Sequence, residues 1–194
     1  MKATRGILWA ALMAAGLTLT AAPISSPAMA AGMAPRQSLE PFGSIKEVKP
    51  FTYCVIDHKG PLTGVSDVIT QLMQAVQVQN LFPLVRGPMV GVYYNSPAQV
   101  KPEELLWEVG FPVTEQAAPK APLEKKTWNY KTVAEALHSG PYAKAGETIQ
   151  RLMTWIGANG YVVDGPVLER YMNNPMQVKP EELRTEIWIP VRKK

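Results

Sequence analysis

A stretch of 21 residues near the middle of the chain returns near its end, and this duplication constrains the fold more than any other feature. Tyr93–Val113 aligns without a gap to Tyr171–Val191 at an offset of 78, and 13 of the 21 positions are identical. Upstream, His58-Lys-Gly-Pro61 returns as His138-Ser-Gly-Pro141 at an offset of 80. The chain is therefore expected to contain two copies of one structural unit.

Each copy, over residues 51–113 and 130–191, has the same predicted order of elements, which is strand, helix, strand and strand. Apolar side chains recur with helical spacing after each Gly-Pro pair, and this predicts one buried helix face per copy. These side chains are Val65, Val68, Ile69, Leu72, Met73 and Val76 in the first copy, and Ala145, Ile149, Leu152, Met153 and Ile156 in the second. The strands are expected over 51–57, 89–95 and 105–113, and over 132–138, 167–173 and 183–191.

Two such units predict an α+β fold made of duplicated β-α-β-β units. We expect one antiparallel sheet with two helices on one face, a ligand cleft on the other, and a pseudo-twofold axis between the copies. Residues 47–194 would form this single domain, with 114–129 as the linker between the copies.

Strand alternation places a carboxylate at the same position in both copies. Residues of one parity, such as Trp107 and Ile187, are expected to pack against the helices, so Glu108 and Glu186 face the other way. Gly110 beside Glu108 would leave room on that face, and Trp188 occupies the matching position beside Glu186. Tyr93 and Tyr171, from the adjacent strands, would add aromatic rings.

This face has two interpretations. If it is flat and solvated, Glu108 and Glu186 are ordinary surface charges. If the sheet curves, the face is a cleft lined by acids and aromatic rings, which favours a cationic, amphipathic ligand because a desolvated carboxylate gains from an incoming positive charge.

The first 30 residues have the three parts of a secretory signal peptide. Lys2 and Arg5 precede the apolar run 7–19, and Ala28-Met29-Ala30 is a small-x-small cleavage site. The apolar run is too short for a bilayer-spanning anchor. We expect cleavage after residue 30, a flexible tail over 31–46, and a periplasmic or secreted protein with no membrane contact after cleavage.

Composition excludes several classes of protein. Without Lys2 and Arg5, 18 basic residues face 16 acidic ones, which is no nucleic-acid footprint. One cysteine forms no internal disulfide, and one cysteine with two histidines makes no closed structural zinc site. We therefore expect no metal, no cofactor and no nucleic-acid partner. The sequence does not predict whether the protein is a monomer or a dimer.

The order of elements, together with the ending Glu182-Leu-Arg-Thr-Glu-Ile-Trp-Ile-Pro-Val191, resembles the GyrI-like small-molecule-binding domain, also called the AraC-type effector-binding domain. The resemblance covers nearly all of 51–191. It implies a site at the pseudo-twofold axis, lined by aromatic residues, in which a glutamate binds cationic, drug-like (multidrug) ligands. By motif position that glutamate is Glu186, with Trp188 beside it and Glu108 as its counterpart.

Three functions follow as hypotheses. The first is an exported small-molecule-binding protein whose ligand contacts Glu186, Trp188, Glu108, Tyr93 and Tyr171. The second is a hydrolase of reactive small molecules, as in some members of the family, with Glu186 as the catalytic general base. The third is a protein-interaction module. The family also resembles haem-binding proteins of the SOUL type, but His58 and His138 precede turns and are interpreted as polar turn residues.

Overall fold

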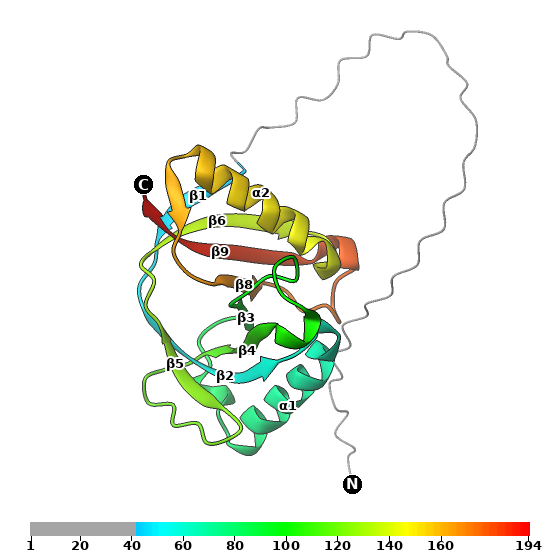
Figure 1. Ribbon diagram of the computed structural model, residues 1–194. Coiled ribbons are helices and arrows are strands. Elements are labelled where there is room, and N and C mark those ends of the chain that lie inside the picture. Colours follow the sequence, from blue (N-terminus) through cyan, green and yellow to red (C-terminus); the bar gives the residue numbers. More distant parts are fainter. Residues whose placement is uncertain (1–41) are drawn as a thin grey trace, which may run out of the picture.

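The computed structural model describes residues 42–194 (Figure 1). The expected signal peptide and most of the expected tail lie outside the described residues. The strands are β1 (Ser44–Glu47), β2 (Phe51–Lys59), β3 (Val90–Tyr93), β4 (Leu106–Pro112), β5 (Glu124–Trp128), β6 (Thr132–Ser139), β7 (Tyr161–Val163), β8 (Val167–Tyr171) and β9 (Arg184–Lys193), and the α-helices are α1 (Val65–Val78) and α2 (Ala145–Ala158).

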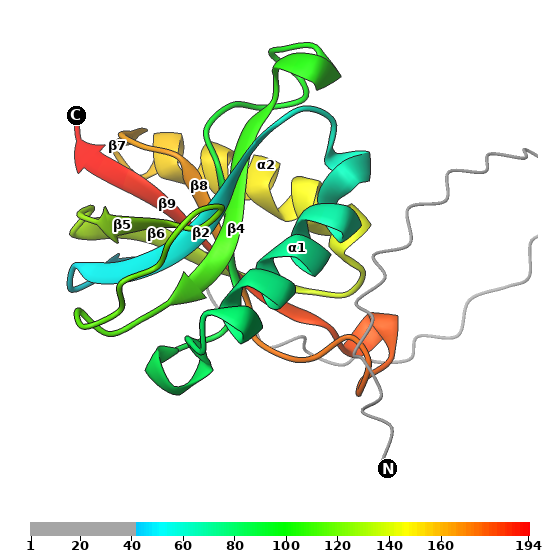
Figure 2. The same cartoon turned by 90° about the horizontal axis from the view of Figure 1, so that it is seen from below.

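The strands form one antiparallel sheet in the order β1-β6-β9-β8-β3-β4-β2-β5, with β7 paired to β9. Both helices cover the same face of the sheet (Figure 2). Helix α1 contacts β2 and β4, whereas α2 contacts β6, β7 and β9. The predicted α+β fold is confirmed, and the predicted strand, helix, strand and strand follow one another in each copy, with the short, unpredicted strand β7 added between α2 and β8 in the second. Among the described residues, no helix is long and apolar enough to cross a bilayer.

The predicted helix faces are the buried ones. In the first copy Val68, Leu72 and Val76 pack against Trp107, Val109 and Phe111 of β4. In the second copy Leu152 and Ile156 pack against Ile187, Ile189 and Val191 of β9. The alternation that assigned these strand residues to the helix face is therefore correct.

The most similar segments of the two copies are loops that make the same hydrogen bonds. The Asn95 amide donates to the Glu104 carbonyl at 3.0 Å and accepts from the Leu106 amide at 2.9 Å. Asn173 makes the same pair of bonds in the second copy, at 2.8 and 3.0 Å. These hydrogen bonds close the loop between the two strands. Each copy needs the same asparagine to make them, which accounts for the similarity of the two loop sequences.

The pseudo-twofold axis passes through the pairing of β3 with β8. In this ladder Val90 faces Arg170, Gly91 faces Glu169 and Val92 faces Leu168. The repeats are offset by 78, so Gly91 and Glu169 are the one pair in this ladder whose members are equivalent in the two copies. The axis of the domain therefore lies at Gly91 and Glu169.

Two strands lie where the sequence suggested a tail and a linker. Strand β1 begins at Ser44, inside the expected tail, and pairs with β6. Strand β5 lies inside the expected linker and pairs with β2. Both are short, largely exposed edge strands rich in charge, so they carry little of the apolar alternation that predicts a strand.

Side chains fill part of the sheet face that points away from the helices. Tyr53, Trp128 and Trp188 belong to a buried cluster there that draws on β2, β3, β5, β6, β8 and β9. Gly110 does not leave room for a ligand on this face, because a Cβ atom there would lie 1.9 Å from the Cys54 carbonyl oxygen. This expectation is wrong because the neighbouring backbone already occupies the space.

Replacing Gly110 by alanine is expected to lower the free energy of unfolding by about 3 kcal/mol or more, since the backbone of β2 must move to admit the methyl group. Gly146 of α2 is the matched control, because a Cβ atom there meets nothing within 4 Å. Gly146→Ala should raise stability by about 0.5–1 kcal/mol through its helix propensity. Urea denaturation of both variants measures the difference, and equal stability of the two would contradict the packing described.

Candidate ligand-binding site

Glu108 is fully buried and already has partners within the chain. Its Oε1 accepts from the Tyr53 hydroxyl at 2.8 Å, and its Oε2 lies 2.5 Å from Nζ of Lys126 on β5. The same Nζ reaches Asp57 at 2.5 Å. Burial raises the pKa of Glu108, and the bonds from Lys126 and Tyr53 oppose that shift. These contacts tie the edge strand β5 to β2 and β4.

Glu186 also has a cationic partner within the chain. It forms an ion pair with Arg170 of β8, and the two side chains are 22% exposed. The Arg170 guanidinium lies over the Trp188 ring, 4.6 Å from its centroid, and the Trp188 indole donates to Glu135 at 2.8 Å. Glu186 and Trp188 are therefore close together, as the alternation predicted. Their charge and aromatic face are directed to residues of the chain itself.

Tyr93 and Tyr171 lie on the opposite face of the sheet from Glu108 and Glu186. Both pack against the cluster of α1 and β4 residues that contains Trp107. Tyr93 is paired with Trp107, and paired residues share a face. The expectation that the two tyrosines line one face with Glu186 is wrong. Alternation assigns residues to the two faces within one strand, but the register decides which residues of a neighbouring strand share each face.

On this helix face a carboxylate and three tyrosines gather at the pseudo-twofold axis. The Tyr171 hydroxyl donates to Oε2 of Glu169 at 3.0 Å, and the Tyr93 hydroxyl lies 2.8 Å from the Tyr171 hydroxyl. The Tyr142 ring packs edge-on against Tyr171, with 5.3 Å between centroids. The central strands β3 and β8 that carry Glu169, Tyr93 and Tyr171 lie between the strands covered by α1 and those covered by α2.

Gly91 makes room for this arrangement. A Cβ atom at position 91 would lie 2.8 Å from the Tyr171 hydroxyl oxygen and 3.0 Å from that of Tyr93. The glycine therefore lets both hydroxyl groups meet above the axis, where the equivalent residue of the second copy, Glu169, supplies the carboxylate.

Glu169 is a buried acid without a counter-charge. It is 7% exposed, and within residues 42–194 no lysine, arginine or histidine forms an ion pair with it. Burial raises its pKa to about 7, and the hydrogen bond from Tyr171 only partly offsets this. Burial and the nearby carboxylate also raise the pKa of Tyr93, Tyr142 and Tyr171, so all three keep their protons at neutral pH.

Sequence reasoning missed Glu169, although two signals pointed to it. Glu169 alternates with Tyr171 along β8, so the two share a face. It also occupies the position of Gly91 in the repeat, the one point at which identical side chains would collide across a twofold axis. The missing piece was the register of β3 with β8, which no local pattern contains.

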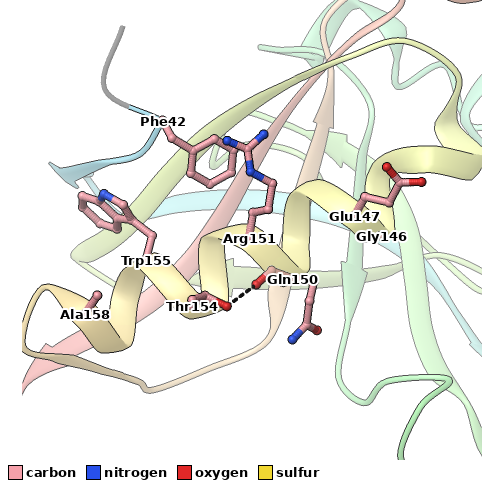
Figure 3. Close-up of a pocket in the computed structure, with 8 residues that line it drawn as sticks. All are labelled: Phe42, Gly146, Glu147, Gln150, Arg151, Thr154, Trp155 and Ala158. Carbon is pink, nitrogen blue, oxygen red and sulfur yellow. Dashed lines mark hydrogen bonds between the residues drawn. The ribbon is translucent and has the colours of Figure 1, made fainter. Parts of the chain in front are cut away.

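A surface hollow lies elsewhere, along the outer side of α2 (Figure 3). Its volume is about 760 Å³, and its walls include Phe42, Arg151 and Trp155. The Arg151 guanidinium lies 3.9 Å from the centroid of the Phe42 ring. The lining residues Glu147 and Arg151 are exposed, so this hollow contains no buried charge comparable to Glu169.

His58 and His138 both contact other side chains of the domain. His138 is buried, with Nδ1 2.8 Å from the Thr148 hydroxyl and Nε2 3.1 Å from the Pro141 carbonyl. His58 packs on Trp107 at 4.6 Å between ring centroids. Among the described residues, no three His, Cys, Asp or Glu side chains gather closely enough to hold a metal ion.

The domain is thus a duplicated sheet with two helices on one face and a buried acid among tyrosines at its centre. The GyrI-like small molecule binding domain matches residues 43–192, and the chain belongs to that family. The sequence has no significant match among curated proteins.

Solved structures share the fold. The EcmrR C-terminal domain superposes with a TM-score of 0.69 at 20% identity, over 78% of this chain and 98% of that one. A hydrolase from Listeria innocua gives 0.61 at 14% identity, over 77% and 91%. SAV2435 bound to tetraphenylphosphonium gives 0.53 at 12% identity, over 77% and 93%. At these identities the likeness is one of fold.

Glu169→Gln is expected to stabilise the protein at pH 8 while leaving its stability at pH 4 unchanged. An ordinary glutamate has a pKa of 4.5, and folding raises that of Glu169 to about 7. Wild type therefore loses stability as the pH rises from 4.5 to 7, on the order of 3 kcal/mol in full. Denaturation of both proteins across this range measures the effect. The exposed Glu181→Gln serves as control, and a variant less stable than wild type at pH 8 would contradict the assignment.

Proposed function

We propose that this protein binds amphipathic organic cations at the Glu169 cluster, which consists of Glu169, Tyr93, Tyr171 and Tyr142. The observation that carries the proposal is the buried carboxylate of Glu169, which has no counter-charge among the described residues. A buried charge of this kind is costly until an opposite charge arrives. A ligand cation would supply that charge.

The tyrosines favour an aromatic or quaternary cation over a small hydrated one. A cation over an aromatic face gains about 0.5–2 kcal/mol per ring, more when water is excluded. The rings also offer apolar area without a fixed array of donors, so they tolerate ligands of different shape. SAV2435, which shares the fold, is bound to tetraphenylphosphonium, a cation of this kind.

Glu108, Glu186 and Trp188 stay predictions as ligand contacts. Lys126 and Arg170 already neutralise the two glutamates, so a ligand cation would have to displace a side chain that is tethered nearby. Within residues 42–194, no side-chain cation competes for Glu169 in this way.

A hydrolase is the second candidate. A glutamate whose pKa is about 7 is suited to general-base catalysis near neutral pH, and a structure with this fold is described as a hydrolase. In this version Glu169 would take the proton of an attacking water while Tyr93 and Tyr171 orient the substrate. Turnover of a reactive ester or epoxide by wild type, with loss of turnover in Glu169→Gln, would favour this function over binding alone.

Tetraphenylphosphonium is expected to bind wild type more tightly as the pH rises from 6 to 8, by roughly tenfold, because Glu169 ionises over this range. Glu169→Gln should lose tenfold or more of the affinity at pH 8 and with it the pH dependence. Calorimetric titration measures both.

Glu186→Gln is the matched control and should stay within about twofold of wild type. Loss of binding in Glu186→Gln with no loss in Glu169→Gln would reverse the assignment and return the site to the other face of the sheet.

We also propose that the protein acts outside the cytoplasm, in a bacterial periplasm. The support is the sequence of residues 1–30 alone. Expression of the full chain in a Gram-negative host should yield a periplasmic protein beginning at Ala31, as read by mass spectrometry of its N-terminal peptide. Recovery of the uncleaved chain from the cytoplasm would contradict export.

A further inference from the structure

The two halves of the site differ in how the helix face is filled beside each tyrosine. Beside Tyr93 lies Trp107, which is 1% exposed and whose indole donates to the Gly60 carbonyl at 3.0 Å. The equivalent residue beside Tyr171 is Thr185. An indole thus occupies the first half, whereas the second half has a short hydroxyl-bearing side chain in its place.

The hydroxyl of Thr185 is buried and unpaired. The side chain is fully buried, and its Oγ1 has no hydrogen-bond partner among the described residues. Its strand neighbours do not satisfy it. His138 of β6 is the partner of Thr185 in the pairing with β9, and its two ring nitrogens lie within hydrogen-bonding distance of Thr148 and Pro141. Tyr171, paired with it across β8, directs its hydroxyl to Glu169 and Tyr93. A buried polar group in this state loses its hydrogen bonds to water without replacement.

Thr185 is placed to reach a ligand held by Glu169. In the pairing of β8 with β9, Glu169 faces Ile187 and Tyr171 faces Thr185. Glu169 and Thr185 are thus diagonal neighbours on one face, a relation that separates Cβ atoms by about 7 Å. A small aromatic ring that carries a cationic group at one end and a polar group at the other is long enough to contact both of these neighbouring side chains.

We propose that Thr185 determines specificity in this site, by hydrogen bonding to a hydroxyl or similar polar group of a cation whose charge lies at Glu169. The inference rests on the function proposed above and adds to it a preference, among organic cations, for those that carry a second, hydrogen-bonding end. The bound ligand would lie in the half of the site next to α2, since Trp107 fills the equivalent space in the other half.

Tyramine and phenethylamine test the proposal, because both are ammonium ions and only tyramine carries a phenol hydroxyl at the far end of the ring. At pH 8, wild type should bind tyramine about five- to tenfold more tightly than phenethylamine. A site built to bond a hydroxyl discriminates in this way against the analogue that lacks it. Thr185→Val should reduce the ratio to about one while phenethylamine affinity stays within twofold of wild type.

Two further variants separate specificity from folding. Thr185→Ser keeps the hydroxyl and should keep the preference for tyramine. Thr114→Val removes the other threonine hydroxyl that is buried and unpaired in the described chain. Thr114 follows the end of β4, so this change should leave both affinities unaltered. Thermal unfolding of each variant shows that the fold is intact.

The outcomes are distinguishable. If wild type binds tetraphenylphosphonium through Glu169 but binds the two amines equally, or if Thr185→Val keeps the preference for tyramine, the role of Thr185 is overturned and the proposed function stands. If wild type binds none of the three cations, the proposed function fails. Loss of the preference in Thr185→Val but not in Thr185→Ser or Thr114→Val supports the inference.

Discussion

The pairing of β3 with β8 joins the two copies, and the rest of the domain depends on its register. Because the ladder runs about a pseudo-twofold axis, residue 91 of the first copy meets its own equivalent, residue 169, at the centre of the sheet. Two identical carboxylates at this point would repel each other, and two bulky side chains would collide. Glycine in one copy and glutamate in the other resolve this, and the freed space accepts the hydroxyl groups of Tyr93 and Tyr171.

The acids on the other face show what a structural carboxylate looks like in this protein. Lys126 of the edge strand β5 pairs with Glu108, and Lys46 of the edge strand β1 pairs with Glu135. The two lysines occupy matching positions, because Lys126 faces Tyr53 and Lys46 faces Val133, which are 80 residues apart. Each edge strand is thus fastened to its half of the sheet by a short ion pair. Glu169 differs from these acids, because it is buried at the centre of the sheet and pairs with no cation in the part of the chain that the structure describes.

Local periodicity was enough to predict the two helices, the six main strands and the side of β4 and β9 that meets the helices. The pattern did not predict the edge strands β1 and β5, because many of their side chains are charged and their pairing depends on partners far along the chain. Tyr93 and Tyr171 were assigned to the wrong face for a related reason. Alternation places Glu108 and Trp107 on opposite faces of one strand. Only the register of β3 with β4 shows that Tyr93 lies on the same face as Trp107.

Several differences between the copies fall on or near the helix face of the sheet. The loops around Asn95 and Asn173 stay alike because each must make the same closing hydrogen bonds. On the helix face, by contrast, Gly91, Leu62, Val68 and Trp107 of the first copy correspond to Glu169, Tyr142, Thr148 and Thr185 of the second. The second copy gains a polar group at three of these positions, and at the fourth a threonine hydroxyl stands in place of the Trp107 indole. Duplication thus produces a symmetric frame whose two halves differ in the side chains that they place on the helix face of the sheet.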